Sequence, residues 1–202
     1  MNLNKVIFSL ISILFLFSIF CSITIGMSWD EPWHHINGAL RAEYLKSFGN
    51  FKNYDFSDNK FYPGLYDTFS FLFSNFLAKV FSEKYYLEIK HLINFTFAFF
   101  TLFGLFQISR KLFNKQIAYL ATFICFVNPF FFGHMSTNPK DIVICFSLVW
   151  FAYYSYIYCK KFEKNRILPL TLAALFMGFG LGIRVSFFVI TVPIIISILI
   201  YI

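Results

Sequence analysis

Two adjacent carboxylates and two histidines follow the first apolar stretch of the chain. This stretch covers residues 6–26, and Asp30 and Glu31 come soon after it. His34 and His35 lie one helical turn further on. Acidic residues that face a water-filled cavity at a bilayer are functional candidates by default. A carboxylate can act as a general base, and carboxylates and imidazoles are both metal ligands.

A second polar group is the sequence Asn-Pro-Lys-Asp at residues 138–141, which His134 precedes. Pro139 is expected among the first residues of a helix, where a missing N–H does no harm. Lys140 and Asp141 would then lie at a helix N-terminus, where free N–H groups and the helix dipole favour an anion such as a phosphate. Asp141 itself would hold a divalent metal or orient Lys140.

A third candidate is Arg184, which follows glycines at positions 178, 180 and 182 near the end of an apolar stretch. Glycines in a membrane helix let another backbone approach closely. The planar guanidinium of arginine matches the geometry of a phosphate. We therefore expect Arg184 to contribute to an anion site.

The composition identifies an integral membrane protein. Of 202 residues, 58% are hydrophobic and only 13% are charged, with 32 Phe, which exceeds the needs of a soluble core. The net charge of +7 does not indicate nucleic-acid binding, because the basic residues lie in short loops between apolar stretches. The four cysteines lack the close pairing of a zinc site or disulfide framework, and we interpret them as packing residues.

Apolar stretches of suitable length predict about six membrane spans, at residues 6–26, 88–109, 116–133, 141–159, 167–183 and 185–202. Pro129 is expected to break or end the third. Residues 27–82 form a loop in which Asp30 would cap a first short helix. Segment 63–82 has a polar face and a Phe-rich face, which favours a helix lying at the interface. A crossing there would give seven spans.

The positive-inside rule supports six spans. Arg110, Lys111 and Lys115 form one basic cluster, and residues 160–166 carry a second. Both clusters are cytoplasmic if segment 63–82 stays on the outer surface. We therefore predict an all-α polytopic bundle, a single module over residues 1–202, with Asp30, Asp141 and Arg184 together on the outer face.

These motifs together resemble a known family. The order of an Asp-Glu pair in the first outer loop, a His-x-x-x-Asn-Pro-Lys-Asp turn and a Gly-rich span ending in Arg is similar to bacterial relatives of the protein O-mannosyltransferases and of the aminoarabinose transferases that act on lipid A. These are GT-C glycosyltransferases, which use polyprenyl-phosphate-linked sugars. The resemblance implies inverting sugar transfer on the outer, periplasmic face of a bacterial inner membrane.

The resemblance also implies roles for particular residues. Asp30 matches the family's candidate for the catalytic base, with Glu31 beside it. Asp141 is placed in the donor or metal pocket. Donor phosphate would be bound by Lys140, Arg184, Lys90 and His91, and further pocket or metal candidates are His34, His35 and His134. A divalent metal is an expectation without a fixed ligand spacing in the sequence to support it.

Two other functions remain open at this stage. A transporter or lipid flippase would use the outer-face charges as a substrate pathway, although such sites usually lie near the bilayer midplane within repeats. A non-catalytic partner of a split enzyme is the second alternative. Relatives usually continue through several more spans, so we expect a C-terminal region or partner beyond Ile202.

The predicted topology can be measured with reporter fusions or cysteine labelling. Residues near Lys52 and Met135 should be outside, and those near Lys111 and Lys161 inside. Finding both Lys52 and Lys111 outside would favour seven spans. It would also separate Asp30 from Asp141.

Overall fold

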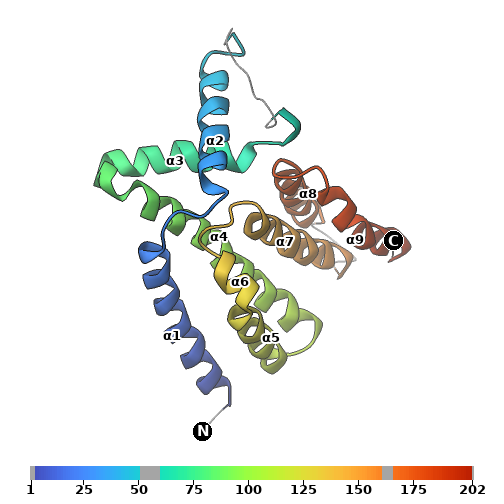
Figure 1. Cartoon of the computed structure of the whole chain (residues 1–202). Helices are drawn as coiled ribbons and strands as arrows, with labels where there is room; N and C mark the ends of the chain where they lie inside the picture. The colour runs from blue at the N-terminus through green and yellow to red at the C-terminus, as the bar shows by residue number, and fades with distance from the viewer. Residues whose placement is uncertain (1–2, 51–59, 161–165, 202) are drawn as a thin grey trace.

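In the computed structural model, which describes residues 3–50, 60–160 and 166–201, every regular element of these ranges is helical (Figure 1). The predicted all-α fold is therefore confirmed. The helices are α1 (Leu3–Thr24), α2 (Glu31–Lys46), α3 (Leu65–Phe81), the short 3-10 helix η2 (Glu83–Tyr85), α4 (Tyr86–Leu112), α5 (Lys115–Val127), α6 (Pro129–His134), α7 (Asp141–Lys160), α8 (Ile167–Leu181) and α9 (Phe187–Tyr201).

Three helices of the described ranges are long and apolar enough to cross a membrane. They are Lys5–Thr24 in α1, Glu83–Leu112 over η2 and α4, and Asp141–Lys160 in α7. Helices α5, α8 and α9 are apolar but shorter, with 13, 15 and 15 residues. Membrane-type helices are thus present, while the choice between six and seven spans stays a prediction.

The two prolines of the middle region behave differently. Pro129 is expected to interrupt its helix, and this is confirmed: α5 ends at Val127 and Pro129 begins the short α6. Pro139 lies in the turn that leads into α7 at Asp141. The Asn138 side-chain oxygen accepts the N–H groups of Lys140 and Asp141 and so caps the helix, which leaves Pro139 as the first residue after the cap, where a missing N–H does no harm.

Helix α3 lies crosswise at the end of the bundle where α1 ends and α4 begins, and α2 rises beside it (Figure 1). The buried face of α3 carries Asp67, Ser70 and Ser74, whereas Phe69 and Phe76 are exposed. A water-facing helix would show the opposite pattern. The amphipathic helix expected over 63–82 is confirmed, and its apolar outer face fits a membrane interface.

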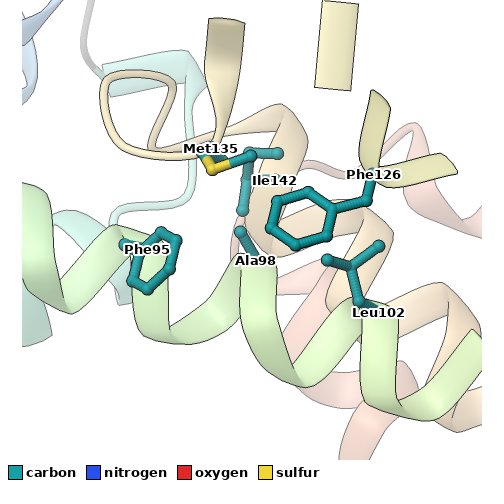
Figure 2. Packing of buried hydrophobic residues seen from close by; sticks show 6 residues of the cluster. All are labelled: Phe95, Ala98, Leu102, Phe126, Met135 and Ile142. Atoms are coloured by element: carbon teal, nitrogen blue, oxygen red, sulfur yellow. The ribbon is translucent and has the colours of Figure 1, made fainter. Parts of the chain in front are cut away.

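Buried hydrophobic side chains fix the turn between α6 and α7 against α4. Figure 2 shows this cluster, which comprises Phe95, Ala98, Leu102, Phe126, Met135 and Ile142. Asn94 on α4 adds polar contacts: its amide donates to the carbonyls of Met135 and Asn138, and its oxygen accepts from Tyr66 of α3. The turn therefore has a defined position beside the start of α2.

The basic cluster at the end of α4 lies at the opposite end of the bundle from this turn (Figure 1). Tyr156 of α7 donates a hydrogen bond to the Lys111 carbonyl over 3.3 Å, so the ends of α4 and α7 are neighbours. This arrangement agrees with the predicted grouping of charges. Lys52, Lys161 and Lys164 lie outside the described residues.

Glycines permit two close contacts of α3, at the end of the bundle opposite the basic cluster. Gly182 accepts the N–H of Leu65 through its carbonyl over 3.1 Å, and a Cβ at Gly182 would meet the Leu65 side chain. Gly38 is where α2 crosses α3, because a Cβ at Gly38 would come to 2.3 Å from the Asp67 carbonyl oxygen. Gly178 faces open space, so the predicted close approach does not extend to it.

Gly38→Ala should therefore destabilise the protein. Alanine favours a helix by about 1 kcal/mol over glycine, but overpacking at a backbone contact costs about 1–3 kcal/mol. The net loss should lower the Tm by a few degrees, at about 2–4 °C per kcal/mol for a chain of this size. Thermal unfolding in detergent measures this change. Gly178→Ala is the matched control and should not lower the Tm; equal losses in both variants would contradict the contact.

Candidate functional site

A polar cavity of about 390 Å³ opens where the start of α2, the turn before α7 and the turn after α8 meet. It brings together six of the residues that the sequence singles out: Asp30, His34, His134, Lys140, Asp141 and Arg184. Ser28, Trp29, Gly133, Thr137, Asn138 and Pro139 complete its lining. The predicted gathering of these three segments is therefore present in the structure.

Asp30 lines this cavity from the position just before α2. The residue immediately precedes α2 but has helical backbone angles, φ −85° and ψ −16°, and its side chain makes no capping hydrogen bond. Capping side chains usually act from an extended backbone. Among the described residues the Asp30 side chain has no hydrogen-bond or salt-bridge partner. The expected capping role is thus not observed.

Glu31 has the opposite environment, with only 2% of its surface exposed. Its Oε1 lies 2.8 Å from His91 Nε2, and its Oε2 accepts the N–H of Ser28. Burial raises the pKa of Glu31, but the hydrogen bonds from His91 and Ser28 and the charge of Lys90 outweigh it, so the pKa falls below its ordinary value. Glu31 does not line the cavity.

Lys90 and His91, predicted near a lipid phosphate, lie behind Glu31. His91 is fully buried, and its Nδ1 donates to the Ser22 carbonyl over 3.1 Å. The Lys90 ammonium is 3.4 Å from the Glu31 carbonyl oxygen. Neither residue lines the cavity. In this structure they connect α4 to the start of α2 and to the end of α1.

The two cations of the cavity already have local partners. The Lys140 ammonium lies 4.4 Å from the centre of the Trp33 ring and 5.0 Å from that of Tyr62, which are cation–π distances. Burial lowers the pKa of Lys140, and nearby carboxylates, Asp67 foremost, partly oppose the effect. Arg184 is 3.7 Å from Asp141, which also accepts from the Asn138 amide.

The helix N-terminus itself is less available to an anion than predicted. Two N–H groups at the start of α7, those of Lys140 and Asp141, already donate to the Asn138 side chain. A phosphate in the cavity would therefore depend chiefly on the side chains of Lys140 and Arg184.

Asp67 is a charged residue of the site that the sequence analysis did not single out as functional. Its two carboxylate oxygens lie 3.0 and 3.1 Å from His34 Nδ1, and it is 9% exposed. The available signal was its place on the polar face of the segment 63–82. That face alone did not identify a partner, because the crossing with α2 is a tertiary contact.

The remaining candidates do not assemble a metal site. His35 turns away from the cavity and lies 3.1 Å from the Tyr86 hydroxyl, while His134 contacts Asn138. Burial and Lys90 lower the pKa of His35. Within the described ranges no three His, Cys, Asp or Glu side chains gather as metal ligands. Asp141, the candidate carboxylate ligand, is paired with Arg184 and Asn138, so the described residues do not fit a metal.

An apolar groove of about 620 Å³ adjoins the polar cavity. Helices α4 to α7 line it, mostly through aliphatic and aromatic side chains, with Cys125 and Cys145 among them. His134 and Asp141 line both the groove and the cavity. A molecule with an apolar tail and a polar head would therefore find both environments in contact.

The buried pair of Glu31 and His91 should make stability depend on pH. A depressed carboxyl pKa contributes stability above the ordinary value of 4.5, and this contribution is lost as pH falls through the folded-state pKa. Glu31→Gln should lower the Tm strongly at pH 7, since removing one partner of a buried pair costs about 3–5 kcal/mol.

Thermal unfolding from pH 7 to about pH 2 measures this prediction, and the difference between parent and variant should shrink as the pH falls below 4.5 and through the folded-state pKa. Glu43→Gln is the control, because Glu43 pairs with Lys46 on the exposed surface and should change little. A pH-independent difference for Glu31→Gln would show that the charge is not what stabilises the contact.

Comparison with known proteins agrees with the resemblance drawn from the motifs. Residues 71–202 match a family model described as dolichyl-phosphate-mannose-protein mannosyltransferase. No curated protein and no solved structure matches the chain significantly. The matched segment includes Lys140, Asp141 and Arg184, and it covers more than half of the 202 residues. The chain therefore belongs to the dolichyl-phosphate-mannose-protein mannosyltransferase family.

Proposed function

We propose that this member of a membrane glycosyltransferase family transfers a sugar from a polyprenyl-phosphate carrier to an acceptor at the outer face of the membrane. The observation that carries the proposal is the unpaired Asp30 carboxylate, which lines one cavity with Lys140 and Arg184. Glycosyl transfer from a phosphate needs a base for the acceptor and positive charge for the leaving group. The cavity contains both.

In the proposed step the acceptor oxygen or nitrogen attacks the anomeric carbon of the sugar. Asp30 takes the proton of the acceptor as the new bond forms. The bond between the anomeric carbon and the phosphate oxygen breaks, and the phosphate leaves with the electron pair. Attack from the face opposite the phosphate inverts the anomeric centre and requires a single base. Lys140 and Arg184 neutralise the phosphate.

The neighbouring apolar groove supports a lipid-linked donor. A polyprenyl phosphate is an amphipathic molecule, and the groove and the cavity meet at His134 and Asp141. A soluble nucleotide sugar would gain nothing from such a groove. The outer-face assignment follows from the charge pattern of the loops.

Transport is less well supported than transfer. Transporter sites usually lie near the bilayer midplane on broken helices. The segments that line this cavity, at the start of α2, before α7 and after α8, lie instead at the end of the bundle where α3 runs crosswise (Figure 1). A non-catalytic partner of a split enzyme would not require an unpaired carboxylate beside two cations. A test of Asp30 as a catalytic base therefore distinguishes sugar transfer from transport and from a non-catalytic role.

Asp30→Asn keeps the size of the side chain and removes its basicity. Because the Asp30 side chain makes no capping hydrogen bond, folding should persist, while turnover should fall by roughly 10²- to 10⁴-fold. The assay uses the full chain with any C-terminal partner supplied and a set of polyprenyl-phosphate sugars. Arg184→Ala and Lys140→Ala should instead weaken binding of polyprenyl phosphate more than Asp30→Asn does.

Transfer by Asp30→Asn within a few-fold of the parent would exclude Asp30 as the base. Glu31 would then be the next candidate, although its carboxylate is engaged by His91. Equal binding of polyprenyl phosphate by the parent, Arg184→Ala and Lys140→Ala would argue against the assignment of Arg184 and Lys140 to the donor phosphate.

A further inference from the structure

The imidazole of His34 connects a buried carboxylate to the polar cavity. Its Nδ1 lies 3.0 and 3.1 Å from the two carboxylate oxygens of Asp67. An ionised carboxylate can only accept hydrogen bonds, so Nδ1 is the donor. His34 also lines the cavity that contains Asp30. The contact with Asp67 fixes which nitrogen carries the proton and leaves Nε2 as the basic atom.

Asp67 is itself held by a row of polar side chains on α2. Its Oδ2 accepts from the Asn37 amide over 2.5 Å, and Asn37 accepts from Arg41 Nε over 2.9 Å. Positions 34, 37 and 41 share one face of α2, and α3 crosses this face at Gly38. The position of Asp67 beneath His34 is thus fixed by contacts independent of the cavity.

The reaction proposed above leaves one proton on Asp30 in every turnover, and this proton must depart before the next acceptor is activated. His34 lies one helical turn after Asp30, and its backbone N–H donates to the backbone carbonyl of Asp30 over 3.2 Å. Both residues line the same cavity. An imidazole is a stronger base than a carboxylate. The imidazole is therefore the natural next proton acceptor.

We propose, resting on the proposed function, that His34 accepts this proton and that Asp67 is its positioning residue. The acceptor's proton passes to Asp30 as the bond to the sugar forms, and then to His34 Nε2. Asp67 stabilises the resulting imidazolium through Nδ1–H. The proton leaves to water through the open cavity, which restores the neutral imidazole. The phosphate keeps the electron pair of the bond that breaks.

The alternative is a purely structural role, in which the contact between Asp67 and His34 only holds α3 against α2. The two roles predict different responses to added base. His34→Ala should lower kcat by roughly 10²-fold with donor binding unchanged, and millimolar imidazole should restore a large part of the loss. Imidazole should not affect the parent. Asp67→Asn should lower kcat less, without rescue by imidazole, and Asp67→Glu should recover part of the activity.

The neighbouring histidine provides a matched control. His35 contacts Tyr86 and does not line the cavity, so His35→Ala should transfer sugar like the parent with and without imidazole. A His34→Ala variant that transfers sugar at the parental rate overturns the inference and leaves the proposed function intact. A slow variant that folds, binds donor and gains nothing from imidazole also overturns it, because the loss is then structural.

A measurement without turnover separates this inference from the proposed function. Diethyl pyrocarbonate modifies basic, accessible imidazole nitrogens, and mass spectrometry identifies the modified histidines. His34 is 3% exposed and lines the cavity, so it should react slowly, and still more slowly in Asp67→Asn. His91, which is fully buried and lines no part of this cavity, should be protected. Protection of His34 equal to that of His91 overturns the inference even if the parent transfers sugar. Failure of the parent to use any polyprenyl-phosphate sugar, with His34 reactive, refutes the proposed function alone.

Discussion

The buried contact between Glu31 and His91 is the constraint on which the site depends. A carboxylate with 2% exposure is stable only with a partner and further hydrogen bonds, and it finds them in His91 and the Ser28 N–H. Since α2 starts at Glu31, this pair ties the start of α2 to α4. It also leaves Asp30, the adjacent residue, directed into the cavity. The two neighbouring carboxylates thus have different environments, because Glu31 is buried against His91 while Asp30 lines the cavity.

The crossing of α2 and α3 holds His34, which lines the cavity, against Asp67. It is close because Gly38 has no side chain to separate the helices, and the closeness lets Asp67 reach His34 and Asn37. The same geometry buries the polar face of α3 and leaves its aromatic face outside. A helix that places charge inward and Phe outward is suited to lie between a membrane and the polar end of a bundle.

Sequence patterns predicted the helical class, the start of α2, the break at Pro129 and the residues around the cavity, because these follow from apolar length, proline chemistry and charge in short loops. They did not predict that Glu31 is buried while Asp30 lines the cavity, because this difference depends on the packing of α4 against the start of α2. Asp67 lies on the predicted polar face of segment 63–82, but the sequence does not indicate which residue it contacts. Lys90 and His91, expected at a phosphate, instead contact the first turn of α2. Long-range contacts of this kind leave no local signal.

The charged pair in the cavity is weaker than the charged pair behind it, and this difference suits the binding and release of a charged ligand. Arg184 and Asp141 are 43% and 60% exposed and 3.7 Å apart, and such surface pairs contribute little stability. A phosphate can replace Asp141 as the partner of Arg184 at small cost. The pair of Glu31 and His91 cannot be exchanged in this way, because separation would leave a buried charge unpaired. The weak pair faces the cavity and the strong pair lies behind it, so a ligand can reorganise the charges without loosening the helices that position Asp30.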